Sequence, residues 1–295
     1  MNVFVKIISR VPLKHLYRVS DYVLYPLLYH VIRYRRKMTR QNLILSFPEK
    51  SLQEIIAIER RYYHFLADLF VEIPWGSGTS PEEMKKHFIV DNMDEIEEWI
   101  LQKGGLFFML GHLGNWEWTP EVQRRFTHPE IQHYNICRRQ KNKTMNDIMM
   151  DIRKHFSGEE SCIEKSNIVR HLVTLHQQKK PFTIGLISDQ KVQPKHAYYR
   201  TEFLHQDTTF LGGGEVLATK FDWGVSYVHI HRVERGVYRL KVQLITLSPK
   251  EEQQYSITEQ FVRLLEDNIH EQPELWLWSH NRWKWERLQQ EESKK

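Results

Sequence analysis

The residues best suited to chemistry lie together in the stretch Gly105–Trp118, which reads GLFFMLGHLGNWEW. An apolar run ends at Gly111, His112 follows it directly, and Glu117 lies five residues beyond the histidine. A carboxylate beside an imidazole fixes the tautomer of the ring and stabilises the imidazolium that forms when the ring accepts a proton. Because the stretch contains no Ser or Cys, the pattern favours general-base catalysis in which a hydroxyl of the substrate is the nucleophile.

Spacing alone makes this a weak pattern, and a structural hydrogen bond between His112 and Glu117 is the alternative. The setting favours chemistry, because an open α/β sheet binds its ligands beyond the carboxyl ends of its strands, where the histidine is expected. The spacing is not that of a zinc protease, which requires two His four residues apart on one helix.

Hydrophobic periodicity predicts the elements that position this stretch. We expect strands near 87–90, 106–110, 131–137 and 182–188, alternating with helices near 92–103, 114–126, 142–156 and 166–178. Such alternation predicts right-handed βαβ units, and therefore an α/β fold with a mostly parallel central sheet flanked by helices. We also expect an antiparallel hairpin of 227–232 with 237–245, a last helix over 256–271 and a short polar tail from residue 288.

Local signals mark the ends of the helices nearer the N-terminus. A helix over 51–70 is expected to begin at Ser51, with Glu54 completing a capping box. The segment Pro74–Ser80 is rich in turn-forming residues and predicts a connection, after which Pro81 opens a short helix.

The composition is that of an ordinary globular protein. The chain has 295 residues, of which 41% are hydrophobic and 27% charged, so global disorder is excluded. The two cysteines, Cys137 and Cys162, cannot by themselves form a disulfide framework or a zinc site, and they fit a reducing compartment.

Positive charge is concentrated at the N-terminus. Residues 1–40 carry nine Lys or Arg against the single acid Asp21, whereas the whole chain has 42 basic and 37 acidic residues. Apolar residues from Leu16 to Ile32 recur at helical spacing, but Pro26 and charged residues interrupt the run before it reaches the ~20 residues of a spanning helix. We expect residues 1–40 to form a membrane-associating helix whose basic cluster meets an anionic surface, and residues 41–295 to form the catalytic domain. A core helix with a solvated basic turn, or a nucleic-acid arm, is the alternative.

Five segments, in order along the chain, resemble the bacterial lipid A late acyltransferases, the lauroyl/myristoyl transferase family of lipopolysaccharide biosynthesis. They are RRKMTRQNLILSFPEKS (35–51), GHLGNWE (111–117), SDQ (188–190), TTFLGGGEVLA (208–218) and PELWLWSHNRWK (273–284). Leu211 stands where the family often has a second Phe, and the N-terminal apolar helix is weak. Both departures bear on substrate choice and membrane depth more than on the reaction.

The resemblance implies a fold similar to that of the glycerolipid acyltransferases and an enzyme at the cytoplasmic face of a bacterial inner membrane. It implies transfer of a fatty acyl chain from a thioester, held by acyl carrier protein or coenzyme A, to a hydroxyl of a lipid A precursor or similar glycolipid. His112 is then the general base and Glu117 its orienter, with no acyl-enzyme and no cofactor beyond the thioester co-substrate. Replacing either residue by Ala is expected to slow the reaction roughly 10²-fold or more.

The remaining substrate-binding candidates follow predicted strands or lie in the matched segments. They are Arg138, Arg139, Asp189, Gln190, Phe210, Gly212 and His280. The arginine pair suits a phosphorylated glycolipid or a phosphopantetheine arm, with a solvated loop as the alternative. The Asp-Gln pair could fix a polar head group, support the site or merely cap a loop. The Phe-Gly segment allows a ligand to approach the backbone closely, and it lacks any nucleotide-binding fingerprint.

Other functions remain open at this point. The acceptor could be a lysophospholipid or a mannosylated phosphatidylinositol, or the chain could be a membrane-binding protein without catalysis. A nucleic-acid role is disfavoured because the chain beyond residue 40 is slightly acidic, and a lipid hydrolase because no G-x-S-x-G elbow is present. We expect no metal site, since His229 and His231, which alternate on one strand, have no further ligand at suitable spacing.

Overall fold

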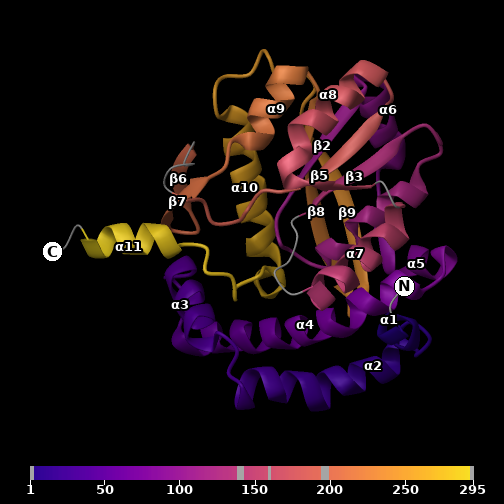
Figure 1. Ribbon diagram of the computed structural model, residues 1–295. Coiled ribbons are helices and arrows are strands. Elements are labelled where there is room, and N and C mark those ends of the chain that lie inside the picture. Colours follow the sequence, from indigo (N-terminus) through magenta and orange to yellow (C-terminus); the bar gives the residue numbers. More distant parts are fainter. Residues whose placement is uncertain (1–2, 138–142, 159–160, 194–198, 293–295) are drawn as a thin grey trace.

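The computed structural model describes residues 3–137, 143–158, 161–193 and 199–292. A seven-stranded sheet of order β1-β9-β8-β2-β5-β3-β4 lies at its centre (Figure 1), and β6 and β7 form a separate hairpin. Every neighbouring pair in the central sheet is parallel except β8 with β9. The strands are β1 (Phe88–Val90), β2 (Gly105–Leu110), β3 (Gln132–Cys137), β4 (Cys162–Glu164), β5 (Phe182–Ile187), β6 (Tyr199–Phe203), β7 (Gln206–Phe210), β8 (Gly224–Glu234) and β9 (Val237–Thr246). The predicted α/β fold with a mostly parallel sheet flanked by helices is confirmed.

The helices precede, follow and connect these strands. The α-helices are α1 (Val3–Ile8), α2 (Leu13–Val19), α3 (Arg36–Ser46), α4 (Leu52–Gly78), α5 (Pro81–His87), α6 (Met93–Lys103), α7 (Lys143–Ser157), α8 (Ile168–Gln178), α9 (Gly213–Phe221), α10 (Ser256–Glu271) and α11 (Lys284–Glu292). The described residues also form two π-helical turns, η1 (Ser20–Leu24) and η2 (Leu27–Val31), and three 3₁₀ segments, η3 (Trp116–Arg125), η4 (Lys165–Asn167) and η6 (Pro273–Leu275).

Most predicted elements are present within a few residues of their expected ends. The four predicted strands of the parallel sheet are β1, β2, β3 and β5, the hairpin is β8 with β9, and the last predicted helix is α10. The helix expected at 114–126 is the tighter 3₁₀ segment η3, which contains Pro120. The short strand β4 and the hairpin of β6 with β7 were missed, because YRTEF and QDTTF carry no apolar run. The polar tail expected from Leu288 is part of α11 instead.

Helix α4 begins where the sequence predicts and ends later. The backbone N–H of Glu54 donates to Ser51 Oγ at 3.4 Å, and the Glu54 carboxylate accepts from the Ser51 N–H at 2.8 Å, so the capping box is confirmed. The expected turn after residue 73 is wrong, because the helix continues through Pro74 to Gly78. Burial of this last stretch and a hydrogen bond from Ser77 Oγ to the Pro74 carbonyl (2.9 Å) outweigh the helix-breaking tendency of proline.

The N-terminal helix layer, which we define as α2, η1 and η2, is helical as predicted. Pro26 lies between the two π-helical turns. A proline within a helix lacks the N–H donor and its ring clashes with the carbonyl four residues earlier, and a wider π turn relieves such a clash. Among the described helices, none combines the length and the apolar character that crossing a bilayer requires.

One face of this layer packs along α4 (Figure 1). Ser20 Oγ donates to Asp68 at 2.6 Å, and the Tyr17 hydroxyl donates to Glu72 at 2.9 Å. Arg235, from the β8–β9 turn, pairs with both Asp21 and Asp68. The opposite face leaves a set of large apolar side chains exposed, namely Val19, Tyr22, Val23, Leu27, Val31 and Ile32. The layer therefore packs on the protein with one face and exposes apolar side chains on the other, and its association with a membrane stays a prediction.

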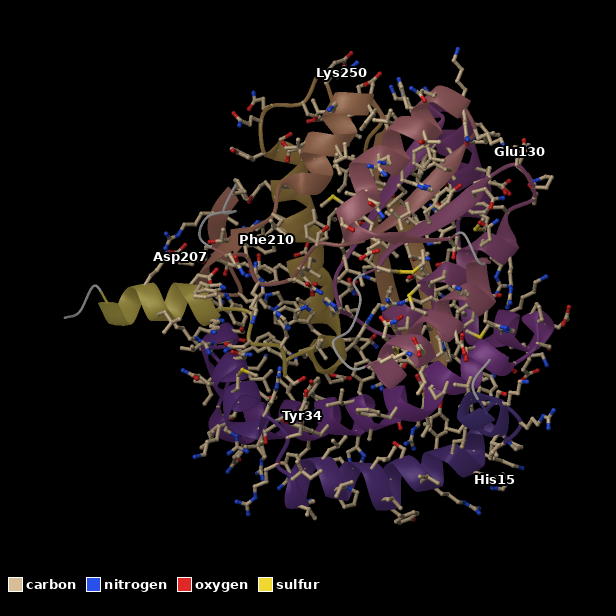
Figure 2. All side chains as sticks on the ribbon, in the orientation of Figure 1. His15, Tyr34, Glu130, Asp207, Phe210 and Lys250 are labelled. Carbon is tan, nitrogen blue, oxygen red and sulfur yellow. A yellow bond between two sulfur atoms is a disulfide. The ribbon has the colours of Figure 1, made fainter. Side chains whose placement is uncertain are left out.

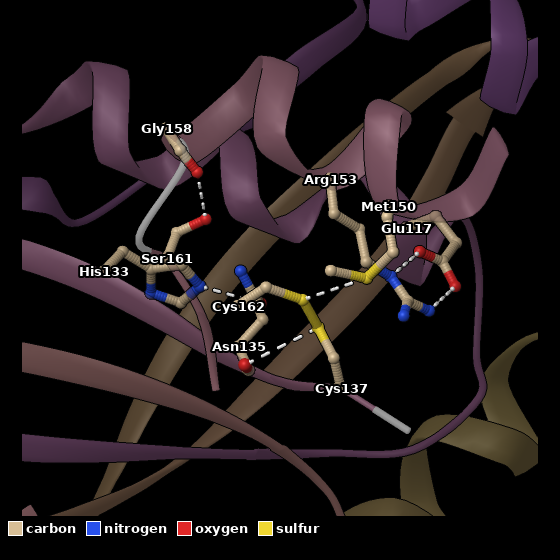
Figure 3. Close-up of a disulfide and its surroundings, with 9 residues drawn as sticks. All are labelled: Glu117, His133, Asn135, Cys137, Met150, Arg153, Gly158, Ser161 and Cys162. Carbon is tan, nitrogen blue, oxygen red and sulfur yellow. Dashed lines mark hydrogen bonds and ion pairs between the residues drawn. A yellow bond between two sulfur atoms is a disulfide. The ribbon is translucent and has the colours of Figure 1, made fainter. Parts of the chain in front are cut away.

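The two cysteines are joined by a disulfide between the neighbouring parallel strands β3 and β4 (Figure 3). Cys137 and Cys162 are 25 residues apart in sequence, with Cα atoms 5.7 Å apart. No local pattern indicated this pairing, because β4 was not predicted as a strand. The structure therefore pairs two cysteines that the sequence analysis took to fit a reducing compartment.

Candidate active site

The register of the sheet brings His112 and Asp189 together. Strands β2 and β5 are parallel neighbours in which Leu110 lies opposite Ile187, so the residues two positions beyond each strand leave the same sheet edge side by side. Asp189 Oδ1 accepts from His112 Nδ1 at 2.6 Å, and Asp189 Oδ2 accepts from the His112 backbone N–H at 2.8 Å. The indole N–H of Trp276 donates to the same Oδ2 at 2.9 Å. Asp189 therefore fixes both the imidazole and the backbone that carries it.

This contact controls the protonation of both groups. Burial by itself would lower the pKa of His112, but the charge of Asp189 and its hydrogen bond outweigh burial, so the pKa of His112 is raised. Burial by itself would raise the pKa of Asp189. The charge of the imidazole and the hydrogen bonds from His112 and Trp276 outweigh burial and hold this pKa well below its ordinary value. The pair therefore favours an imidazolium beside a carboxylate, which is the state that a general base reaches after it takes a proton.

The loop that carries His112 is held by close packing and by the C-terminal segment. A side chain at Gly111 would meet Leu265 at 2.6 Å, and Gly114 has a φ of +59°, which favours glycine. The His112 carbonyl accepts from the Leu277 N–H, and the Gly114 N–H donates to the Leu275 carbonyl, both at 3.0 Å. Segments far apart in the sequence thus fix the position of the imidazole.

The second nitrogen of the His112 imidazole, Nε2, is the one that a substrate hydroxyl can approach. The side chains of Gln190 and His280 lie beside it. Gln190 Nε2 lies 3.4 Å from His112 Nε2, and the His280 ring lies parallel to the His112 ring with centroids 6.4 Å apart. The His112 side chain is 14% exposed, so the ring can be reached while most of it is buried. Burial lowers the pKa of His280 to about 4, which keeps this second ring neutral.

Glu117 does not hold the imidazole as the sequence analysis expected. Its two oxygens instead accept from Arg153 Nε and Nη2 at 2.9 and 2.7 Å (Figure 3). Burial by itself would raise the pKa of Glu117, but Arg153 and the nearby His112 outweigh burial and lower it. The residue that holds Nδ1 of His112 is therefore Asp189 and not Glu117. The charge of Glu117 still raises the pKa of His112, without a direct hydrogen bond.

The other predicted candidates separate into two groups. Arg138 and Arg139 lie outside the described residues, so the structure does not place them. Phe210 is buried in the interior (Figure 2), where its ring packs on Phe203 and lies 4.7 Å from the Arg282 guanidinium carbon. Gly212 is the N-cap residue of α9 and has an ordinary φ of −76°. Asp189, Gln190 and His280, which were also assigned to substrate binding, lie around His112.

Three residues near the site were missed by the sequence analysis. No local signal relates Arg153 to Glu117, because 36 residues separate them. Trp276 lies in one of the matched segments, but 87 residues separate it from Asp189, and no local pattern relates its indole to that carboxylate. Glu72, in the middle of α4, is buried and accepts from Asn115 Nδ2 at 3.1 Å, which anchors the far end of the loop between β2 and η3.

Comparison with known protein families agrees with the geometry. A model of the family described as bacterial lipid A biosynthesis acyltransferase matches residues 1–285. The chain belongs to this family. It is an acyltransferase that acts in lipid A biosynthesis, with an acyl donor and a lipid acceptor as substrates. No curated protein matches the sequence.

Proposed function

We propose that His112 is the general base of direct acyl transfer from a thioester to a hydroxyl of a lipid A precursor. The acceptor oxygen attacks the thioester carbonyl carbon while His112 Nε2 takes the hydroxyl proton. When the tetrahedral intermediate collapses, the carbon–sulfur bond breaks and the imidazolium returns the proton to the departing thiolate. The products are an ester on the acceptor and a free thiol, and the thioester supplies the activated acyl group without a cofactor.

One observation carries this proposal: the buried Asp189 carboxylate pairs with Nδ1 of an imidazole whose Nε2 remains reachable. Asp189 fixes the tautomer that presents a lone pair at Nε2, and it stabilises the imidazolium. Glu117 adds negative charge near the ring and is itself neutralised by Arg153. No side chain among these groups is a Ser or Cys nucleophile, which supports direct transfer without an acyl-enzyme. Arg138 and Arg139 stay candidates for binding the acceptor or the developing oxyanion.

We assign the donor to acyl carrier protein and place the enzyme on the cytoplasmic face of the bacterial inner membrane. The exposed apolar face of the N-terminal helix layer, followed by the exposed Arg33, suits the boundary between acyl chains and anionic head groups. The division into a membrane-associating segment, 1–40, and a catalytic domain, 41–295, is part of this proposal.

The disulfide gives this placement a direct test, because disulfides are rare in reducing compartments. An enzyme on the cytoplasmic face is expected to have Cys137 and Cys162 reduced in cells. Alkylation of intact cells with a membrane-permeant thiol reagent, followed by mass spectrometry of the protein, then labels both cysteines. A protein that remains unlabelled until a reductant is added contradicts the cytoplasmic placement.

Mass spectrometry of reaction products tests the proposed reaction. The purified enzyme is incubated with an acyl carrier protein thioester, or with the matching coenzyme A thioester, and a lipid A precursor or a lysophospholipid. We expect the lipid A precursor to gain one acyl group, with the carrier protein as the better donor. Release of free fatty acid without an acylated lipid indicates a hydrolase and contradicts the proposal, as does exclusive acylation of the lysophospholipid.

A further inference from the structure

A large basic groove opens beside the proposed catalytic site. Neither His112 nor Asp189 lines it. It has a volume of about 1200 Å³ and lies between α3, the residues after β5 and the start of α11. His280, whose ring is parallel to that of His112, lines it, and so does Lys191, the neighbour of Gln190 in sequence. The groove therefore reaches to within one side chain of the reactive imidazole.

Positive charge dominates the lining. Seven of its thirteen lining residues are Arg or Lys, and none is acidic. Arg36 and Arg40 share one buried carboxylate, that of Glu59. In the part of the chain that the structure describes, no carboxylate pairs with the other five, which are Arg33, Arg35, Lys37, Lys191 and Lys284. Such a concentration of exposed and unpaired positive charge costs folding free energy unless an anion binds there.

The same groove has an apolar strip. Ile44 and Leu45, in the last turn of α3, are 43% and 40% exposed and line it together with Met38. At its other end, Arg33 follows directly on Val31 and Ile32, which belong to the exposed apolar face of the N-terminal helix layer. The groove thus connects that apolar face with the surroundings of His112.

We propose that this basic groove binds the phosphate groups of a phosphorylated glycolipid acceptor while its acyl chains stay against the apolar face of the N-terminal helix layer. This inference rests on the proposed function and names how the acceptor is held. The phosphates pair with the lysines and arginines, and the sugar hydroxyl to be acylated extends past His280 to His112 Nε2. Arg35, whose Nη1 donates to the Ser279 carbonyl at 3.0 Å, fixes the two sides of the groove relative to each other.

A lipid fits the groove better than a carrier protein does. The surface of an acidic protein could meet the lysines at the rim, but it would leave the concave apolar strip of Ile44 and Leu45 exposed to water. A phosphorylated lipid satisfies both parts, because it carries anionic and apolar groups on one molecule. The continuity with the apolar face also gives such a lipid a path from a membrane to the imidazole.

The test removes charge at three exposed lysines that hold no other contact with a carboxylate. The triple variant K37Q/K191Q/K284Q is compared with the control K180Q/K241Q/K250Q, which removes three exposed lysines outside the groove lining. We expect the groove variant to raise the KM for lipid A precursor about tenfold, because each lost charge contact weakens binding. We expect kcat at saturation and the KM for the thioester donor to stay unchanged, and the control to behave like the wild type.

A binding experiment separates this inference from the proposed function. The proteins are mixed with phosphatidylcholine vesicles that contain lipid A, lipid A from which a phosphatase has removed the phosphates, or phosphatidylglycerol. We expect the groove variant to lose affinity for the vesicles with phosphorylated lipid A. Its affinity for the vesicles with dephosphorylated lipid A and for those with phosphatidylglycerol should equal that of the wild type. Equal loss on phosphatidylglycerol vesicles means general attraction to anionic membranes and overturns the inference, as does unchanged binding of phosphorylated lipid A. A higher KM for the donor alone assigns the groove to the donor and also overturns it. If the wild type binds lipid A through the groove but acylates no acceptor, the proposed function fails and the groove assignment stands.

Discussion

Two buried carboxylates, Asp189 and Glu72, hold opposite ends of the loop between β2 and η3, and the groups that donate to them differ. Asp189 accepts from the backbone and imidazole of His112 at the start of the loop, where the imidazole can carry a positive charge. Glu72 accepts only from neutral donors, which are Asn115 at the end of the loop and the hydroxyls of Tyr17 and Tyr238. Both carboxylates are buried almost completely.

Their pKa values move in opposite directions as a result. Burial and the charge of nearby Asp68 raise the pKa of Glu72 to about 7, since three neutral donors compensate only part of the desolvation. The imidazole of His112 holds the pKa of Asp189 far below its ordinary value despite equal burial. Burial therefore does not decide the charge of a carboxylate in this protein, and an ionisable partner does. The charged end of the loop is the end we assign to catalysis, and the neutral end to structure.

Replacement of Asp189 by Asn is expected to have the largest effect among the carboxylate variants. The side chain keeps its shape but loses the charge that stabilises the imidazolium and one of its two acceptor oxygens, so it can no longer accept from both the His112 backbone N–H and Nδ1 with separate oxygens. We expect kcat to fall about 10³-fold. Steady-state acyl transfer measures this, with the exposed D94N as the control variant. A D189N enzyme that folds and keeps the wild-type kcat would place the orienting role elsewhere.

Replacement of Glu117 by Gln is expected to have the next largest effect, about 10²-fold on kcat, because it removes a buried negative charge that pairs with Arg153 and favours the charged imidazole of His112. It is also expected to lower the free energy of unfolding by about 3 kcal/mol. The double variant E117Q/R153Q separates the two consequences. We expect it to regain stability in denaturant unfolding without regaining kcat, and full recovery of kcat would reduce the pair to a structural role.

The pH dependence of kcat/KM sharpens the comparison further. A general base must be neutral to accept a proton, and the pKa of His112 is raised above its ordinary value of 6.5. We expect kcat/KM to increase with pH through an apparent pKa above 6.5 in the wild type. In D189N this limb shifts to lower pH, because the largest interaction that favours the charged imidazole is gone. An unshifted limb would mean that another group titrates.

The smallest effect on activity is expected at the other carboxylate. Because Gln can still accept from Asn115, we expect E72Q to keep nearly the wild-type kcat. Its effect appears in stability. Between its ordinary pKa of 4.5 and about 7, the folded protein binds more protons at Glu72 than the unfolded chain does, so stability falls as pH rises across this window. Ionisation of Glu72 therefore lowers the free energy of unfolding by about 3 kcal/mol across this window.

Denaturant unfolding at several pH values measures that contribution, with E72Q as the comparison. The stability of the variant relative to the wild type should therefore increase from pH 4.5 to pH 7. A parallel dependence on pH in both proteins would contradict the assignment, and a large loss of kcat in E72Q would remove the distinction between the two ends of the loop.

The sequence predicted those parts of the fold that local patterns encode. The apolar runs of β2 and β5, the capping box at Ser51 and the helix α10 each follow from residues close together in the chain. The end of α4 was wrong because the packing of the segment after Pro74 depends on distant residues, such as Trp118 against Gly76. The hairpin of β6 with β7 was missed because its polar residues have no strand pattern.

The candidate site was predicted in part for the same reason. His112 was found from its strand–turn setting, and Asp189 was named because it also follows a strand, but their contact depends on the register of β2 with β5. Glu117 was assigned to the imidazole because it is close in sequence. Its actual partner, Arg153, comes from α7, and no pattern within the chain relates the two helical segments.

The most direct test of the account is a single-turnover measurement of acyl transfer by the His112→Ala variant. The enzyme in excess is mixed with acyl carrier protein thioester and lipid A precursor, and mass spectrometry follows both the lipid and the protein, with the exposed H128A as the control. We predict that the wild type and H128A add one acyl group to the lipid without acylating themselves, and that H112A is slower by about 10²-fold or more. Transfer at the wild-type rate by folded H112A, or an acyl group attached to the enzyme, would contradict the account.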